Sequence, residues 1–384
     1  MVPAHDGRAA EPVYRPLLSG RRGELEALAH LDDAAAPLLA PVLDLPALDP
    51  YTVDLLGRLP PGLVCAVDVS ALPDTSEGEL VRRGVPLVPV IGLAESDRRL
   101  VAHGVAARAY ARRAVVRLRT GQVRAGPDAT TSAVERVWRL ARLVPEQCDL
   151  LIDAGDVCCP ADVRLAESRI RRLAGWARRH AWRSVTVAAG GLPPTLARLP
   201  TDEPVRLDRF DWQLWQRLAD LGVGYGDYGV DCAVPGSDGP ADRLPTLRYT
   251  TDDAWWIYRW SRRGGRGDER LADLCRTLVA APYWPAAGAG FSWGDHEILR
   301  RARRGAGAGS PANWLAWSTS HHLAHVLAAL RHDEAEQPWR AGQDVPERGR
   351  DVPERGRDVP ERGRDVPERG RSGRPRGGET RRAG

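Results

Sequence analysis

Short apolar segments return along the chain at intervals of about 25 to 35 residues, the length of one β-strand followed by one α-helix. They occupy residues 37–45, 62–69, 85–93, 113–118, 148–155, 183–190, 223–229 and 247–251. They are rich in Val, Leu and Ile and lack polar alternation, a pattern typical of parallel strands buried on both faces. The eight units predict an α/β fold, a (β/α)8 TIM-barrel-like domain with its barrel at about 37–262. An open doubly wound sheet is the alternative.

The intervening segments have the periodicity of amphipathic helices, most clearly at 131–144, 161–180 and 208–222. The apolar faces of the first and third are formed by Val134, Val137, Trp138, Ala141 and Val144, and by Leu214, Trp215, Leu218 and Leu221. One connection, 230–245, is too rich in Pro and Gly for a helix. The seventh unit of the barrel is therefore expected to be irregular.

The pattern changes after the eighth apolar run. Residues 252–260 would either extend that strand or form a hairpin with it, and 268–281, 294–304 and 317–331 are predicted helices. We expect 267–333 to form a helical elaboration packed on the barrel, so that 13–333 is one domain. The polar residues 1–12 are expected to be disordered. So is 334–384, where D-V-P-E-R-G-R recurs from residue 344 and offers almost nothing to bury.

Composition limits the chemistry. The chain contains no Lys, which excludes a lysine Schiff base or a Walker-type phosphate lysine. A net charge of +4 gives little support for nucleic-acid binding. Without an apolar secretory segment or a membrane-spanning run, a cytoplasmic protein with no membrane association is expected. The six cysteines form no C-x-x-C pair and are expected to be reduced, although the adjacent Cys158 and Cys159 are candidates for a redox or metal site.

Several segments resemble the beta-protein family, which is known from bacteriophage T4 and from bacteria. They are the opening YRPLLSGRRGELEALAHL (14–31) with LLAPVLDLP (38–46), GDYG (226–229), LRYTTDDAWWIYR (247–259) and the late His321–His322. The resemblance spans about 13–332 and implies a phage-related family and its fold, but no particular reaction. Where the family's opening has Lys, this chain has Ser19, and Arg21 is the nearby cation. Arg21 and Glu24 are ligand-binding candidates because they lie in this opening, although an ion pair three residues apart would also explain them.

Functional residues of barrels gather at the carboxyl ends of the strands. There the sequence has Asp68, Asp153, Asp227 and Arg117. The three carboxylates are candidate catalytic residues or ligands of a divalent cation, and the alternative is that they cap the next helix. For Asp44, capping is the preferred interpretation, because Leu45 and Pro46 follow it. Neither H-x-H nor H-E-x-x-H is present to support a zinc hydrolase.

Arg117 would need an anionic partner if buried at the barrel mouth. Asp68, Asp153, or a phosphate or carboxylate on a ligand could supply it. Further ligand-binding candidates near predicted strand ends are Tyr228, Tyr249, Tyr258, Arg259 and His322. His321 is a candidate general base, with the histidine pair expected in a first helical turn capped by residue 318, 319 or 320; core hydrogen bonding is the alternative. Trp255, Trp256 and Trp260 are expected to pack in the core.

Residues 224–229 match G-x-G-x-x-G, the fingerprint of dinucleotide-binding folds. A predicted helix precedes them and none follows, so the motif lacks its necessary context. We interpret it as a glycine-rich barrel strand, the seventh of eight, and expect neither NAD nor FAD.

Taken together, these features favour a pocket at the carboxyl ends of the strands that binds or acts on a small anionic ligand, phosphorylated ones included. One alternative is a non-catalytic scaffold protein in phage–host conflict. A nucleic-acid-associated protein is the second alternative, disfavoured by the small net charge.

Overall fold

The computed structural model describes residues 13–47, 49–74, 87–110, 112–121, 126–234, 244–261, 267–303 and 307–336. Of the segments expected to be disordered, 1–12 and 337–384 lie outside them, as does 235–243 of the irregular connection. Residues 334–336, which were expected to belong to the disordered tail, instead end the last described helix, Pro311–Glu336, so the expectation is wrong there. The chain divides into two compact units, Met1–Ala341 and Gly342–Gly384, and every described residue belongs to the first. Within this part of the chain no helix is long and apolar enough to cross a membrane.

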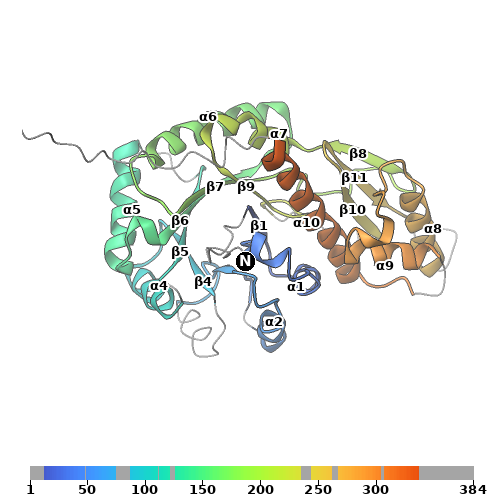
Figure 1. Ribbon diagram of the computed structural model, residues 1–384, viewed down its shortest axis with the longest axis horizontal. Coiled ribbons are helices and arrows are strands. Elements are labelled where there is room, and N and C mark those ends of the chain that lie inside the picture. Colours follow the sequence, from blue (N-terminus) through green and yellow to red (C-terminus); the bar gives the residue numbers. More distant parts are fainter. Residues whose placement is uncertain are drawn as a thin grey trace, which may run out of the picture. The chain divides into compact units, whose positions relative to one another are not determined.

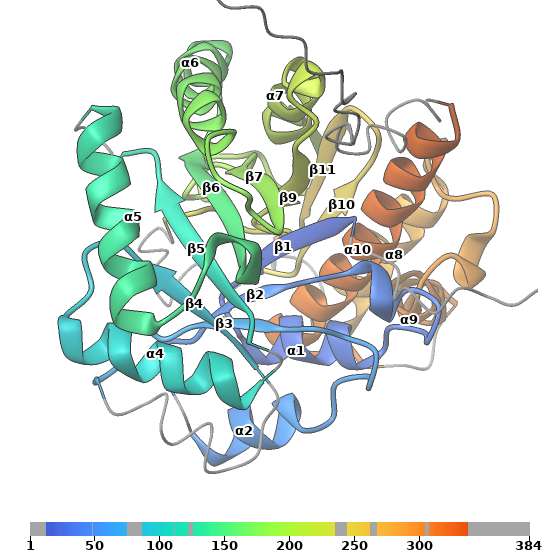
Figure 2. The same cartoon turned by 60° about the vertical axis from the view of Figure 1, so that its left-hand side comes forward.

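Eight parallel strands close into a barrel in the order β1-β2-β3-β4-β5-β6-β7-β9, which Figure 2 shows ringed by helices. The strands are β1 (Tyr14–Leu18), β2 (Val42–Asp44), β3 (Ala66–Asp68), β4 (Val88–Gly92), β5 (Ala114–Arg119), β6 (Cys148–Asp156), β7 (Ser184–Gly190) and β9 (Gly224–Asp227). Closure is made by β1 and β9, where Tyr14 pairs with Tyr225 and Pro16 with Asp227. The predicted barrel is confirmed, and the open doubly wound sheet is wrong.

Seven of the eight predicted strands belong to the barrel, but the eighth lies outside it and the first barrel strand was not predicted. The first barrel strand, β1, was not recognised because Arg15 and Pro16 interrupt its apolar pattern. The run at 247–251 does form a strand, but outside the barrel, so the barrel strands extend over 14–227 and not 37–262. The glycine-rich strand β9 is therefore the eighth barrel strand and not the seventh.

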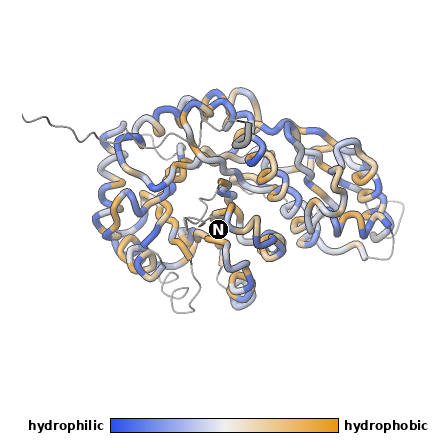
Figure 3. The backbone as a smooth tube through the Cα atoms, viewed as in Figure 1, coloured by the Kyte–Doolittle hydropathy of each residue, from blue (hydrophilic) through white to orange (hydrophobic). Residues whose placement is uncertain are grey.

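The barrel is covered by helices whose buried faces match the expected stripes. They are α1 (Arg22–Ala29), α2 (Pro50–Leu56), α4 (Asp97–Ala109), α5 (Pro127–Ala141), α6 (Pro160–Ala177) and α7 (Phe210–Arg217), with short 3₁₀ turns η1 (Ala36–Leu38), η2 (Pro145–Gln147) and η3 (Ala219–Leu221). Figure 3 shows hydrophobic and hydrophilic positions interleaved along these helices. Val134, Val137 and Ala141 are buried, whereas Val144 lies beyond the end of α5 and is 50% exposed, against expectation.

A second, smaller sheet stands beside the barrel (Figure 1). Its antiparallel strands β10 (Thr246–Thr250), β11 (Ala254–Arg259) and β8 (Pro204–Asp208) are joined in that order. The pair β10–β11 confirms the hairpin and excludes the extended strand. Helices α8 (Gly267–Val279) and α9 (Trp293–Ala302), with the turn η5 (Gly288–Gly290), complete this layer. Trp255 and Trp260 are buried, and Trp256 packs against the cluster that contains Trp260.

The last helix, α10 (Pro311–Glu336), lies between the barrel and the smaller sheet (Figure 1). It packs on α1 at Gly23, where a Cβ atom would overlap the carbonyl oxygen of Ala312. Leu323 and Val326 of α10 join the outer core formed with Tyr14 and Leu18 of β1. The helix thus packs over the place where β1 and β9 close the barrel, and it forms part of the core of the domain. It begins well before Ser318, so the predicted cap at 318–320 is wrong and His321 and His322 lie inside the helix.

Candidate functional site

Side chains that point into the barrel form layers along its axis, because every second residue of a strand faces the lumen. The middle layer is apolar and includes Leu17, Val42, Val90, Val115, Leu151 and Ala188. At the carboxyl ends of the strands the next inward positions are charged. The barrel is therefore closed by packing in the middle and polar at its mouth.

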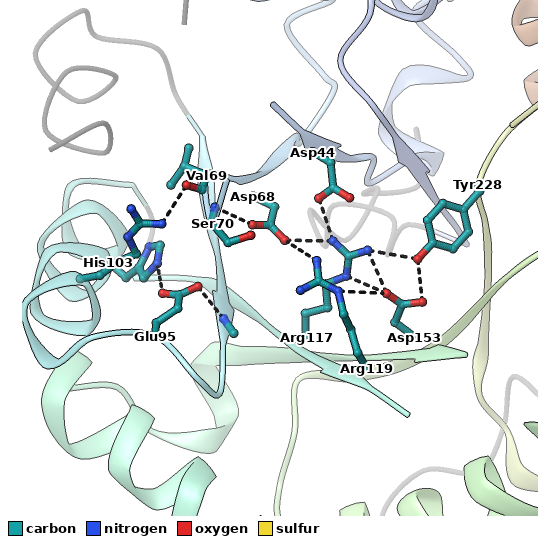
Figure 4. A network of polar contacts seen from close by, with 12 residues as sticks. Asp44, Asp68, Val69, Ser70, Glu95, His103, Arg117, Arg119, Asp153 and Tyr228 are labelled. Atoms are coloured by element: carbon teal, nitrogen blue, oxygen red, sulfur yellow. Dashed lines mark hydrogen bonds and ion pairs between the residues drawn. The ribbon is translucent and has the colours of Figure 1, made fainter. Parts of the chain in front are cut away.

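Arg117 of β5 lies at the centre of this mouth and binds carboxylates from three other strands (Figure 4). Its Nη1 atom donates to Asp44 Oδ1 at 2.7 Å and to Asp68 Oδ2 at 2.9 Å. Its Nε atom donates to Asp153 Oδ2 at 2.9 Å. The alternative partners proposed from the sequence for Arg117 are thus resolved in favour of the chain's own carboxylates.

The carboxylates around Arg117 are held in place by further hydrogen bonds. The Tyr228 hydroxyl donates to Asp153 Oδ1 at 2.7 Å and accepts from Arg117 Nη2 at 3.1 Å. The amide of Gly155 donates to Asp153 Oδ1, and that of Ser70 to Asp68 Oδ1, each at 2.9 Å. A buried polar network with its partners satisfied is rigid. Arg117, Asp68, Asp153 and Tyr228 therefore form a fixed floor, which we call the Arg117 floor.

Two charged side chains above this floor remain open to solvent. Asp44 and Arg119 each keep 38% of their side-chain surface exposed, whereas Arg117 keeps 3%. The contacts of Arg119 to the floor are long, at 3.5 Å from Nη2 to Asp68 Oδ2 and 3.7 Å from Nε to Asp153 Oδ2. Arg119 is thus loosely held and reachable, as is Asp44.

The surroundings of Asp44 and Asp68 shift the pKa values of these two acids in opposite directions. Burial, together with the charge of Asp68, outweighs Arg117 and raises the pKa of Asp44 to about 6. Burial would also raise the pKa of Asp68, but hydrogen bonds from Ser70 and the charge of Arg117 hold it below its ordinary value. Burial and the neighbouring Asp153 raise the pKa of Tyr228 well above its usual range, so its hydroxyl keeps its proton. Asp44 therefore exchanges its proton closer to neutral pH than Asp68 does.

A second acid–base pair lies beside the floor, at the carboxyl end of β4 (Figure 4). Glu95 accepts from the amide of Gly92 at 2.9 Å through Oε1, and its Oε2 lies 2.6 Å from His103 Nε2 of α4. Both side chains are nearly inaccessible. The pair fixes the loop that borders the mouth.

Asp227 was expected at the same mouth, but it points outward under α10. Its Oδ1 accepts from the Tyr14 hydroxyl at 2.6 Å and from the Gly229 amide at 2.9 Å, and its Oδ2 lies 2.9 Å from His322 Nε2 and 3.0 Å from the Tyr225 hydroxyl. His322 is completed by Thr250 Oγ1, 2.8 Å from Nδ1. All these side chains are fully buried. The arrangement joins β1, β9, β10 and α10, and we call it the Asp227 seam.

His321, on the other side of α10, is equally buried. Its Nδ1 lies 3.0 Å from Asp295 Oδ2 and its Nε2 lies 2.9 Å from the carbonyl oxygen of Thr250. Tyr249 donates to Asp295 Oδ1 at 2.8 Å and stacks on the imidazole ring of His321. This cluster joins α9, α10 and β10, away from the barrel lumen. The placement corresponds to the core hydrogen bonding that the sequence left as the alternative.

The remaining candidates are dispersed. Tyr258 contacts Tyr283 and Arg259 donates to the carbonyl oxygen of Leu199, both in the smaller sheet. Arg21 and Glu24 form the expected ion pair at 3.1 Å at the start of α1, and Arg21 also pairs with Asp231. Of the twelve candidates, Asp68, Arg117, Asp153 and Tyr228 meet at one site.

Comparison with known proteins identifies the family. The family model described as Beta protein matches residues 14–328, well over half of the chain. The chain belongs to the beta-protein family. None of the curated proteins matches the sequence of this beta-family barrel.

Solved structures similar to this beta-family barrel share little sequence with it. Alanine racemase from Clostridium difficile 630 is 11% identical over 46% of each chain, with a TM-score of 0.29. Triosephosphate isomerase from Bartonella henselae is 14% identical over 57% of this chain and 92% of its own, with a TM-score of 0.32. Arginine decarboxylase from Campylobacter jejuni is 13% identical over 82% and 55%, with a TM-score of 0.33. TM-scores this low carry no argument about the fold, and the evidence for the barrel is its strand order.

Sequence reasoning missed three residues at the mouth of this beta-family barrel. Asp44 was taken for a helix cap, but it ends β2 facing inward beside Arg117. Arg119 could have been found, since it lies two residues beyond Arg117 and so on the same face of β5. Glu95 follows β4 in a loop and carries no recognisable sequence pattern.

The carboxylates of the mouth do not form a metal centre in the part of the chain that is described. Among these residues no group of three or more His, Cys, Asp or Glu is placed to hold a metal ion. The Arg117 guanidinium occupies the position between Asp44, Asp68 and Asp153 that a cation would need. The vicinal Cys158 and Cys159 are free thiols, and burial raises the pKa of Cys158 to about 12.

Proposed function

We propose that the mouth of the barrel binds a small anionic ligand, with Arg119 as the contact for the anion and Asp44 as the acid–base group. One observation supports this assignment above the others. The polar groups of the Arg117 floor are hydrogen-bonded to one another and to neighbouring amides, whereas Arg119 and Asp44 stay reachable directly above it. The carboxyl end of the strands is also where barrel enzymes place their reactions.

Arg119 has the chemistry to hold an anion. A guanidinium group presents parallel N–H donors that match a carboxylate or phosphate, and such charge-assisted pairs are strong. Its present contacts are 3.5 and 3.7 Å long, compared with 2.7 to 2.9 Å for those of Arg117 to the same layer of carboxylates. Turning Arg119 toward a ligand therefore breaks only these two long contacts. Phosphorylated and carboxylated metabolites both fit this requirement.

Asp44 supplies the second function of the site. A carboxyl group with a pKa of about 6 carries a proton part of the time near neutral pH, as a general acid or base requires. Arg117 Nη1, 2.7 Å away, fixes one of its oxygens, and the rest of the carboxyl group faces solvent. A ligand that binds Arg119 and carries an exchangeable proton would place that proton close to the Asp44 carboxyl group.

Replacing Arg119 by glutamine is the direct test. We expect a screen of phosphorylated and carboxylated metabolites by thermal shift to find stabilising ligands, and Arg119→Gln to weaken their binding at least about tenfold, the loss of one hydrogen-bonded charge pair. Titration calorimetry measures the change. The matched control is Arg206→Gln, an exposed arginine of the smaller sheet that pairs with Asp208 and Asp253. Silence of the wild-type protein across the whole panel would overturn the proposal and favour the non-catalytic scaffold.

The pH dependence of binding tests the role of Asp44. Its pKa is raised to about 6, so it is charged at pH 7.5 and largely neutral at pH 5. Since an ionised Asp44 repels an anion on Arg119, affinity should increase as the pH falls through 6. The measurement needs a hit whose own charge is constant over this range, such as a sulfonate. In Asp44→Asn the affinity should be higher at pH 7.5 and nearly independent of pH, and an unchanged slope would contradict the assignment.

A further inference from the structure

The amino-terminal end of the barrel carries a cluster of like charges around one acid. Arg15 of β1, Arg113 before β5 and Arg183 before β7 all face Asp149 of β6. Arg113 Nε donates to Asp149 Oδ2 at 2.7 Å, Arg15 Nη2 lies 3.4 Å from the same oxygen, and Arg183 Nε lies 3.9 Å from Oδ1. The Ser184 hydroxyl also donates to Asp149 at 2.6 Å. Asp149 thus has every contact that its two oxygens need.

The charges of this cluster do not balance. Three guanidinium groups face one carboxylate among the described residues, an excess of two positive charges (three minus one). The mouth has the opposite composition, with two arginines facing three aspartates. A cluster that served only to close the barrel would gain nothing from surplus like charges, because they repel each other in a medium of low dielectric constant.

Arg15 is the most buried arginine of the cluster, and its contact to Asp149 is longer than that of Arg113. Its guanidinium has five N–H donors, and the contact found for it is the 3.4 Å approach to an oxygen that Arg113 already occupies. Burial lowers the pKa of Arg15, Asp149 opposes the shift, and the charges of Arg113 and Arg183 add to it. A second negative charge at this position would relieve the repulsion and offer acceptors to the N–H groups of Arg15 that do not contact Asp149.

We propose that Arg15, Arg113 and Arg183 form a binding site for a small oxyanion of the phosphate class at the amino-terminal end of the barrel. The exposed fraction of the side chains increases from 7% for Arg15 through 14% for Arg113 to 43% for Arg183, so Arg183 is the member of the cluster that an ion in solution would meet first. Guanidinium groups are the preferred protein ligands of phosphate oxygens. The apolar layer of Leu17, Val115 and Leu151 separates this site from the mouth, so the two sites are independent.

The test uses inorganic phosphate, with sodium chloride at matched ionic strength as the reference. It is carried out in the Arg119→Gln background, so that the mouth cannot contribute. Phosphate should raise the melting temperature and bind in calorimetry. Adding Arg113→Gln and Arg183→Gln should weaken that binding at least about tenfold, since each removes a charged hydrogen-bond donor. Adding Arg206→Gln instead should leave it unchanged.

Two results separate a binding site from a purely structural cluster. In phosphate-free buffer Arg183→Gln should melt at the wild-type temperature or above it, because it removes repulsion, and yet lose the response to phosphate. Glycerol phosphate distinguishes the source of the ion: binding as tight as that of inorganic phosphate assigns the site to phosphoryl groups of metabolites, and binding of inorganic phosphate alone assigns it to the free ion. No phosphate response in the Arg119→Gln protein, or a response that persists in the triple variant, would overturn the proposal.

Discussion

Arg117→Met is expected to lower the free energy of unfolding by about 3 to 5 kcal/mol at pH 7, the usual cost of removing one partner of a buried ion pair. Methionine fills much of the volume but leaves Asp68 and Asp153 facing each other without their shared cation, and Arg119 approaches them only at 3.5 and 3.7 Å. Urea unfolding followed by circular dichroism measures the loss.

The acid dependence of this loss identifies its cause. As the pH falls, the stranded carboxylates of the variant take up protons, so the difference between Arg117→Met and the wild-type protein should shrink toward pH 4. Arg206→Met, at an exposed ion pair, should cost less than about 1 kcal/mol at any pH. A loss below 1 kcal/mol for Arg117→Met would mean that the floor does not hold the mouth together.

Asp227→Leu should be the most disruptive change in the Asp227 seam. It removes the acceptor of the Tyr14 hydroxyl, the Gly229 amide and His322 Nε2 in a fully buried site. With about 1 to 3 kcal/mol for each of the three stranded buried donors, the free energy of unfolding should fall by at least about 3 kcal/mol. Calorimetric melting and urea unfolding both report it.

Asp227→Asn and Asp54→Leu complete this experiment. Asparagine keeps one acceptor oxygen and should recover part of the loss, and Asp54 is an exposed residue of α2 that pairs with Arg58. Burial would raise the pKa of Asp227, but His322 and the hydrogen-bond donors around it hold the pKa below its ordinary value. Because the folded-state pKa is depressed, this stabilisation is present at neutral pH and is lost as the pH falls through the acidic range. Equal stabilities of Asp227→Leu and Asp54→Leu would contradict the role of the seam.

The local sequence pattern predicts most strands of the barrel, but not β1, the strand that closes it. The strands β2 to β7 are buried on both faces and are therefore largely apolar in sequence, and β9 lies in a predicted glycine-rich run. In β1, Arg15 faces the lumen and reaches the amino-terminal cluster, and Pro16 interrupts the apolar run, so the strand has no recognisable pattern in the sequence. The run at 247–251 is a true strand, but nothing local tells a parallel barrel strand from an antiparallel one in a separate sheet.

The sequence predicts which residues lie near the carboxyl ends of the strands, but not which of them face the barrel lumen. Asp68, Arg117 and Asp153 were found because they end apolar strands. Asp227 and Tyr228 also end a strand, but neighbouring side chains point to opposite faces, so one enters the seam and the other the mouth. Which of the two faces inward depends on the register between β9 and β1, a long-range property that no local pattern contains.

The packing of α10 has a consequence for the order of assembly during synthesis. The surface of β1, synthesised before the other strands of the barrel, receives its cover from residues 311–336, the last helix that the structure describes. Since domains emerge from the ribosome amino-terminus first, the strands can associate while their closing seam is still bare. Until α10 arrives, Tyr14 and Asp227 lack His322, and the groove at Gly23 is empty. The nascent barrel thus depends on its most distal helix to become a finished domain, and folding to completion has to wait for nearly all of the described chain.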